Sequence, residues 1–166
     1  MTRSAPGDIA RRAISLHVTG MSDTLSPSER SERMSRVRNR DTKPELRVRR
    51  LVHSLGYRFR LHRRDLPGSP DLVFPRYRAV IFVHGCFWHM HSDVNCRLAR
   101  TPKSRLDFWG PKLRSNQVRD EQVIQSLVAL GWRVLVIWEC QVKDEEKLKT
   151  EILGFLTNKG ASCAGD

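Results

Sequence analysis

Four side chains of the types that bind zinc lie in two separate segments of the chain. Cys86, His91 and Cys96 follow one another at five-residue intervals, and Cys140 stands in a later segment. Three thiolates and one imidazole are a common tetrahedral ligand set of structural zinc, so the pattern predicts a site that fastens a loop to the strand carrying Cys140. The alternative is that Cys86 and Cys140 are ordinary buried thiols.

A second group of residues suits a hard divalent cation. Asp71 follows Pro70 at the start of a predicted strand, and a neighbouring predicted strand ends at Val83 and His84. Such a carboxylate is a good oxygen ligand, and metal-dependent hydrolysis of phosphodiesters needs such ligands beside the phosphate. A Pro-Asp pair is more commonly an Asx turn, so the sequence leaves both interpretations open.

Several other polar residues stand in otherwise apolar surroundings. Glu45 closes a capping box at the start of a predicted helix, which is a sufficient structural role. Asn116 and Asp120 are four residues apart and share a helix face, which in most helices is exposed to solvent. His89 precedes His91 by two positions, and this places it beside the predicted zinc loop.

Two pairs of adjacent aromatic residues, Phe87-Trp88 and Phe108-Trp109, lie in or near predicted loops. Burial in the core is the usual fate of such side chains. Because two large neighbours on a loop cannot easily both point inward, we expect at least one to be exposed. In a basic protein, an exposed aromatic ring can stack on bases or enter between them.

The distribution of charge indicates a polyanionic partner. The chain has 166 residues and a formal net charge of +12; residues 29–64 carry thirteen basic and four acidic side chains, a net charge of +9. Twelve of the thirteen are arginines, which form paired hydrogen bonds with phosphate. Nucleic acid is the favoured partner. The alternatives are a solvated basic surface and, less favoured because this stretch lacks an apolar face, an anionic membrane surface.

Composition excludes an integral membrane protein and a disulfide scaffold. No apolar run approaches the roughly 20 residues of a membrane-spanning helix, and the mean hydropathy is −0.49. No signal peptide is recognisable near the N-terminus, and four cysteines are too few for a disulfide framework. We therefore expect a cytoplasmic protein with reduced thiols.

Hydrophobic periodicity predicts an α/β chain. Helices are expected at residues 31–37, 42–55, 104–130 with a kink at Gly110-Pro111, and 144–156, and strands at residues 57–61, 71–74, 79–83 and 132–138. This order predicts a small mixed sheet with helices on both faces, whose last strand is reached through a helical crossover. Residues 28–157 form the predicted domain, between tails at 1–27 and 158–166 that are expected to be disordered.

Six segments, taken together, closely resemble the very short patch repair DNA mismatch endonucleases. They are Arg30–Thr42 (RSERMSRVRNRDT), Leu66–Asp71 (LPGSPD), Ile81–His89 (IFVHGCFWH), Asp107–Trp109 (DFW), Asn116–Asp120 and Gly131–Cys140 (GWRVLVIWEC). The match extends over roughly 110 residues between Ser31 and Cys140, and the order of the segments agrees with that family.

The resemblance implies a restriction-endonuclease-like fold, which is a three-layer α/β/α domain with a central mixed sheet and a loop held by Zn²⁺. It implies an Mg²⁺-dependent endonuclease that nicks one strand on the 5′ side of the thymine in a T·G mismatch, and so starts very short patch repair. Such mismatches arise by deamination of 5-methylcytosine. Double-stranded DNA with this mismatch is the implied partner, mismatch-repair proteins are candidate partners, and a monomer acting at the nucleoid is expected.

The resemblance also implies catalytic roles for individual residues. Asp71 and the backbone carbonyl of Val83 match magnesium ligands, although the family often has threonine at the second position. His89 matches the residue that activates the attacking water. The polar residues that match supporting positions around the metal, the waters and this histidine are Glu45, His84 and Asp120.

Further matches concern DNA and zinc. The residues that match aromatic side chains entering the base stack are Phe87, Trp88 and Trp109. Those that match other DNA contacts are Asn116 and, in a segment that grips the minor-groove side, Arg36, Arg38 and Arg40. The matching zinc ligands are Cys86, His91, Cys96 and Cys140.

The chain departs from the common nuclease signature, because Phe82-Val83-His84 stands where other nucleases have a second carboxylate and a lysine. The stretch from His91 to Cys96 is longer than in some relatives, which makes Asp93 an alternative ligand to Cys96. Two rival functions are a zinc-containing DNA-binding protein without catalysis and a restriction nuclease that cuts both strands. A mere binder would not need a carboxylate and a histidine for catalysis.

Overall fold

A computed structural model describes residues 40–100 and 105–158, together with residues 26, 28, 29, 32 and 35. Its elements are α2 (Lys43–Ser54), β1 (Leu72–Phe74), η1 (Pro75–Tyr77), β2 (Ala79–His84), α3 (Leu106–Ala129), β3 (Arg133–Trp138), η2 (Gln141–Lys143) and α4 (Glu145–Thr157). Most of the predicted helix at 31–37 and nearly all of both predicted tails lie outside the described residues, so the domain limits stay a prediction.

The three strands form one mixed sheet in the order β1-β2-β3. β1 and β2 are antiparallel, with Leu72 opposite Ile81, and the turn η1 joins them. β2 and β3 are parallel, with His84 opposite Trp138, and α3 makes the crossover between them. The predicted mixed sheet with a helical crossover is therefore confirmed.

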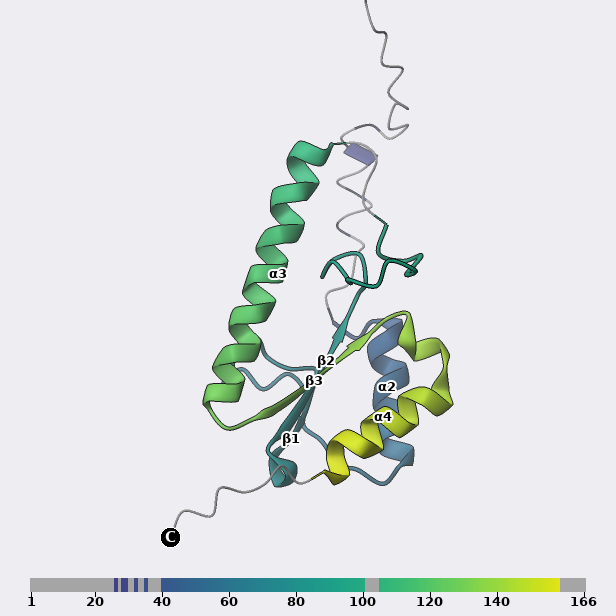
Figure 1. The fold of residues 1–166 in the computed structure, drawn as a ribbon, viewed down its shortest axis with the longest axis vertical. Helices are drawn as coiled ribbons and strands as arrows, with labels where there is room; N and C mark the ends of the chain where they lie inside the picture. Colours follow the sequence, from purple (N-terminus) through teal and green to yellow (C-terminus); the bar gives the residue numbers. More distant parts are fainter. Residues whose placement is uncertain are drawn as a thin grey trace, which may run out of the picture.

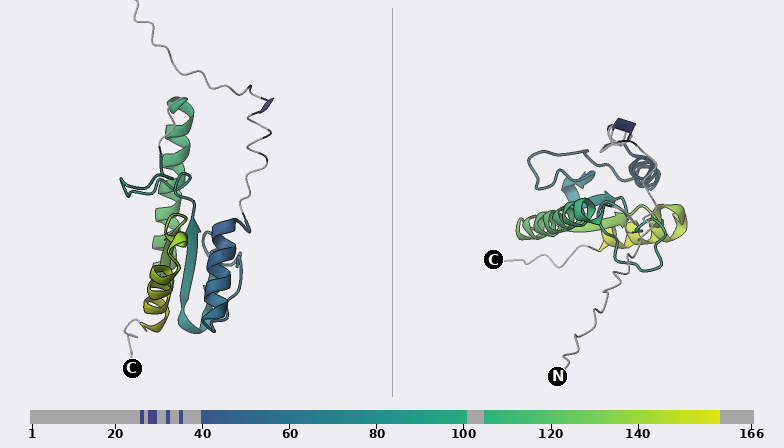
Figure 2. Two further views of the ribbon diagram at one scale, coloured as in Figure 1. Left: turned by 90° about the vertical axis from the view of Figure 1, so that its right-hand side faces the viewer. Right: turned by 90° about the horizontal axis from the view of Figure 1, so that it is seen from above.

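The helices cover both faces of the sheet, as Figures 1 and 2 show. Along β2, Ile81 and Val83 belong to a core shared with α2 and α4, whereas Val80 and Phe82 belong to a second core beneath α3. This alternation follows from the two-residue period of a strand. The α/β class and the three-layer α/β/α architecture are confirmed.

The predicted strand at 57–61 is wrong. Only Arg60 pairs with β1, through two backbone hydrogen bonds with Val73, of 2.9 and 2.8 Å. β1 is three residues long, and the N–H and C=O groups of successive residues alternate between its two edges. Those of Val73 point to the outer edge, where they bond to Arg60, so those of Leu72 and Phe74 point to β2. Beyond Arg60, the His62 N–H donates to the carbonyl of Pro70, which precedes β1, and His62 has a φ of 45°, so no further residue of this segment pairs with β1.

Two details of the helices also differ from expectation. Thr42 does not cap α2 with its side chain; its hydroxyl instead donates to the Glu45 carboxylate at 2.8 Å. α3 continues through Pro111 and Figure 1 shows it as one uninterrupted helix, so the predicted break is not seen. No helix in the part of the chain that the structure describes is long and apolar enough to cross a membrane.

Candidate active site

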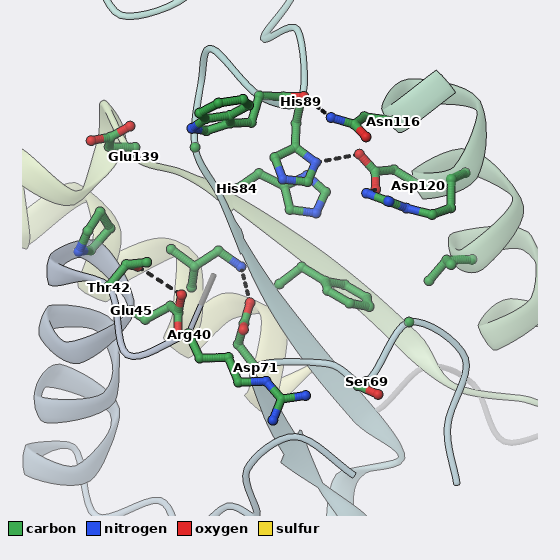
Figure 3. Close-up of a pocket in the computed structure, with 18 of the residues that line it drawn as sticks. Arg40, Thr42, Glu45, Ser69, Asp71, His84, His89, Asn116, Asp120 and Glu139 are labelled. Atoms are coloured by element: carbon green, nitrogen blue, oxygen red, sulfur yellow. Dashed lines mark hydrogen bonds and ion pairs between the residues drawn. The ribbon is translucent and has the colours of Figure 1, made fainter. Parts of the chain in front are cut away.

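A single cavity of about 790 Å³ lies between the start of α2, the end of β2 and one face of α3. It brings together residues that are up to 99 positions apart in the sequence, from Arg40 to Glu139 (Figure 3). All six residues for which the resemblance implies a catalytic role line it: Glu45, Asp71, Val83, His84, His89 and Asp120. Arg40, Trp88 and Asn116, which match DNA contacts, line it as well.

Asp71 lies immediately before β1 and is fixed by a hydrogen bond from the backbone of the neighbouring strand, β2. Its Oδ2 accepts a hydrogen bond from the Val83 N–H at 2.8 Å, and its side chain is 18% exposed. Burial raises the pKa of the Asp71 carboxyl to about 6; the Val83 hydrogen bond opposes this shift and the Glu45 carboxylate adds to it. The Asx-turn alternative is not what positions this side chain.

The carbonyl of Val83 lies on the same edge of β2 as its N–H. In an antiparallel ladder, a residue turns both groups to the same neighbour. The register would pair Val83 with Pro70, two residues before β1 begins at Leu72, so no residue of β1 pairs with Val83. The carboxylate of Asp71 and the carbonyl of Val83 therefore face the same open edge of the sheet. Two such oxygens form a donor set that suits Mg²⁺.

His89 forms the centre of a second group of residues on the other side of the cavity. Its Nδ1 is hydrogen-bonded to Asp120 Oδ2 on α3, and its ring stacks on His84 with centroids 3.9 Å apart. Because an ionised carboxylate can only accept, Nδ1 carries the proton, and in the neutral ring Nε2 is the unprotonated nitrogen. Burial lowers the pKa of His84 to about 4, so that ring is neutral at physiological pH.

The Asn116 and Asp120 face of α3 is not turned to solvent. The Asn116 side chain donates to the backbone carbonyl of Trp88 at 3.1 Å, and Asp120 holds His89. α3 therefore positions the loop that follows β2, and the solvent-exposed alternative for this helix face is wrong.

The aromatic residues of this loop pack on one another and on the start of α3. Trp88 lies 5.0 Å from Phe87 and 5.9 Å from Trp109, measured between ring centroids. All three are half-buried, and Phe108 is exposed. The expectation that at least one aromatic side chain would be exposed is confirmed.

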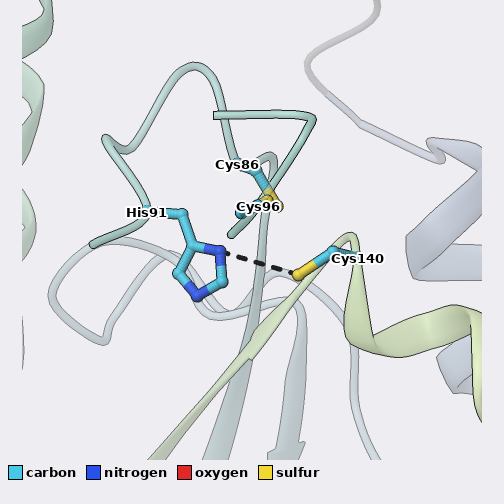
Figure 4. Close-up of side chains that lie close together, drawn as sticks. All are labelled: Cys86, His91, Cys96 and Cys140. Atoms are coloured by element: carbon cyan, nitrogen blue, oxygen red, sulfur yellow. Dashed lines mark hydrogen bonds between the residues drawn. The ribbon is translucent and has the colours of Figure 1, made fainter. Parts of the chain in front are cut away.

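The four predicted zinc ligands converge at the base of the same loop (Figure 4). Their ligand atoms all lie within 4.8 Å of one another, and the Cys140 Sγ is 3.6 Å from the His91 Nδ1. A tetrahedral zinc with a Zn–S bond of about 2.3 Å and a Zn–N bond of about 2.0–2.1 Å requires a separation of about 3.6 Å between these atoms. The Cys3His cluster therefore fits a structural zinc.

Comparisons with known proteins decide the family. A family model described as DNA mismatch endonuclease Vsr matches residues 22–95. The chain is 52% identical over 136 residues to "Type II nicking enzyme V.XorIIP" of Xanthomonas oryzae pv. oryzae, which covers 82% of this chain and 98% of that protein. The chain belongs to the Vsr family of DNA mismatch endonucleases.

Other relatives agree with this assignment. "DNA mismatch endonuclease Vsr" of Escherichia coli is 44% identical over 151 residues, covering 88% of this chain and 95% of that protein. The catalytic domain of homing endonuclease I-Bth0305I superposes with a TM-score of 0.50 at 18% identity, covering 73% of this chain and all of that domain, and it supports the fold alone. As a Vsr-family protein, the chain is a DNA endonuclease that takes DNA as its substrate.

The Vsr-family pocket contains residues that the sequence analysis did not identify. Lys112 and Arg119 line the cavity from α3, on the same face as Asn116, and supply positive charge next to the candidate catalytic groups. The seven-residue spacing from Lys112 to Arg119 was a recognisable signal. His62 lines the cavity beside Asp71, but its place in an irregular loop gave no periodic signal.

The structure describes only one of the three arginines that the resemblance matches to DNA contacts. Arg40 lines the cavity and is exposed. Arg36 and Arg38 lie outside the residues that the structure describes. Their predicted contact with the minor-groove side of DNA stays a prediction.

Replacing Cys140 by serine is expected to reduce both zinc content and stability, because the site loses one of four ligands and the loop loses its link to the end of β3. Elemental analysis and the thermal midpoint test this expectation. Cys163→Ser is the matched control, since Cys163 is not among the four predicted ligands. A full complement of zinc in the Cys140→Ser protein would contradict the ligand set.

Proposed function

We propose that this Vsr-family endonuclease nicks one strand of duplex DNA on the 5′ side of the thymine in a T·G mismatch, with Mg²⁺ as cofactor. The observation that carries the proposal is the convergence of Asp71, the Val83 edge of β2 and the His89–Asp120 pair on one cavity. The name of the E. coli relative supports the mismatch substrate. We propose that the enzyme acts as a monomer.

The proposed metal site consists of Asp71 and the Val83 carbonyl. When bound there, Mg²⁺ would neutralise charge that develops on the scissile phosphate. Burial raises the pKa of the Asp71 carboxyl to about 6, which disfavours its ionised form. A cation bound beside it would offset this, because a nearby positive charge favours the ionised carboxylate. The Val83 N–H keeps one carboxylate oxygen in place and leaves the other open to the cavity.

The proposed general base is the Nε2 of His89. Asp120 holds the ring in the tautomer that leaves this nitrogen unprotonated, and it stabilises the positive charge once the ring takes a proton from water. The neutral His84 ring beneath it adds no repulsion to that charge. Glu45 is held by Thr42 and the backbone N–H of Asp41, and it contributes negative charge on the Asp71 side of the cavity.

Mismatch selectivity is proposed to come from the aromatic residues. Insertion of rings between base steps costs a few kcal/mol of unstacking, and a T·G wobble pair is easier to unstack than a matched pair. Trp88 lies in the cavity wall next to the proposed base, and Phe87 and Trp109 pack beside it. The zinc-held loop would keep these rings in position.

The test is a nicking assay on duplexes labelled on either strand, with a T·G or a T·A pair at the same position, in Mg²⁺. We expect one cut, in the thymine strand of the T·G duplex. Cleavage of both strands would favour a restriction nuclease. Nicking of matched DNA at a fixed sequence would favour a sequence-specific nicking enzyme, in keeping with the names of several relatives.

Replacing Trp88 by alanine is expected to raise KM for the T·G duplex by roughly tenfold, because a base stacked on an aromatic ring gains about 1–3 kcal/mol. Binding to a fully paired duplex, measured in parallel, should change little because that duplex is not unstacked. Equal KM values for wild-type and Trp88→Ala protein, both shown to be folded by circular dichroism, would contradict the proposal that the Trp88 ring inserts between base steps.

A further inference from the structure

A cluster of charged residues lies against the Asp71 side of the cavity. Ligand atoms of Asp41, Glu45 and His62 come within 4.8 Å of one another, a spacing that could hold a metal ion. The guanidinium of Arg49 already contacts all three, at 2.5 Å from Asp41 Oδ1, 3.0 Å from Glu45 Oε2 and 3.0 Å from His62 Nε2. The cluster therefore contains its own permanent cation.

Arg49 is placed on the inward face of α2. Its side chain is 10% exposed and that of Glu45 is 5% exposed, although arginine and glutamate are seldom buried unless paired. Its Nε is buried without a hydrogen-bond partner among the residues that the structure describes. Burying a charged guanidinium with one unpaired N–H lowers the free energy of unfolding, so we expect Arg49 to have a further role beyond carrying charge.

The contact with Arg49 determines where His62 carries its proton. A guanidinium has five donors and no acceptor, so the ring nitrogen that faces it must accept. Nε2 of His62 is therefore unprotonated, and in the neutral ring the proton resides on Nδ1. This Nδ1 lies 3.9 Å from Asp71 Oδ1, too far for a direct hydrogen bond but close to the carboxylate oxygen that Val83 does not hold.

We propose that His62 is a positioning residue for Asp71, with Arg49 fixing its tautomer. The His62 N–H favours the orientation in which Asp71 Oδ1 faces the cavity, while the Val83 N–H holds Oδ2. The inference rests on the proposed function, because it assigns His62 a role at the proposed metal ligand. It also explains why Arg49 stands where a second metal ion would otherwise fit.

The chain offers a matched set of variants. Glutamine can replace both functions of the ring, since its carbonyl accepts from Arg49 and its amide N–H donates towards Asp71. Leucine fills similar space and does neither. His53→Leu is the control, because His53 is exposed near the end of α2.

Two measurements test the proposal. In Mg²⁺-free protein, ¹⁵N NMR of the imidazole should show His62 protonated on Nδ1. In nicking assays, the Mg²⁺ concentration for half-maximal rate should rise roughly tenfold or more in His62→Leu, in line with other residues that support metal ligands, and should stay within about twofold of wild type in His62→Gln and His53→Leu.

The outcomes separate this inference from the proposed function. A wild-type His62 protonated on Nε2, or a His62→Leu enzyme with the wild-type Mg²⁺ requirement, would overturn the inference. Equal impairment of His62→Gln and His62→Leu would also overturn it, because the shared donor and acceptor would then not matter. Asp71→Asn enzyme that still nicks would instead overturn the proposed metal site.

Discussion

Replacing Asp71 by asparagine is expected to abolish nicking and, at the same time, to stabilise the protein. The loss of activity follows because the carboxylate is the only acidic ligand of the proposed metal site, and stabilisation of charge on the phosphate by a metal amounts to several kcal/mol, on the order of a thousandfold in rate. Binding to T·G duplex should persist, because the aromatic and basic contacts are unchanged.

The gain in stability follows from the pKa of Asp71. An aspartate in an unfolded chain has a pKa of about 3.9, whereas the folded protein raises it to about 6. The folded state therefore binds this proton more tightly, so its stability is highest below about pH 4 and falls as the pH rises through 6. Neutral asparagine escapes this penalty, which is up to about 3 kcal/mol at neutral pH.

Denaturant unfolding in Mg²⁺-free buffer measures this difference. Asp71→Asn should exceed wild type in stability at about pH 8, and the two should converge near pH 4. Asp65→Asn is the matched control, because Asp65 is an exposed acid paired with Arg63 in the preceding loop. An inactive Asp71→Asn protein that is also less stable at pH 8 would mean that its loss of activity reports misfolding.

Replacing His89 by glutamine is expected to reduce the single-turnover nicking rate by roughly 10²–10⁴-fold, the usual contribution of a general base. Asp120→Asn should impair the same step, because the amide N–H can turn to His89 Nδ1 and favour the tautomer in which Nε2 is protonated. If the two residues act as one unit, the double variant should be no slower than His89→Gln alone.

Glu121→Gln is the control for Asp120→Asn, since Glu121 is exposed on α3 next to Asp120. Additive losses in the double variant would show that Asp120 acts independently of His89. Full activity of His89→Gln at every pH would remove His89 from the proposed mechanism.

Periodicity was enough to predict most of the fold. The apolar positions of α2 and α4 and the continuous apolar runs of β2 and β3 agree with the structure within a few residues. The strand prediction for residues 57–61 was wrong although their apolar and polar residues alternate as in a strand. β1 is so short that only the Val73 N–H and C=O are available on its outer edge. Strand pairing depends on the partner's length, which no local pattern contains.

The candidate site was also predictable from the sequence only in part. Asp71 and His89 were found through motifs, and the cavity that unites them depends on the tertiary arrangement of β2 and α3. His62 was missed because a left-handed loop residue has no periodic signal. Arg49 did carry a signal, since it lies four residues after Glu45 on the buried face of α2, where a charge needs a partner.

The most direct test of the shared catalytic site is crystallographic. Crystals of the protein with a T·G duplex whose scissile linkage cannot be cleaved would be soaked in Mn²⁺, and the ion located by anomalous scattering. We expect a peak beside Asp71 Oδ1 and the Val83 carbonyl, with the scissile phosphate between that peak and His89 Nε2. A peak among Asp41, Glu45 and His62, or a scissile phosphate out of reach of His89, would contradict the proposed site.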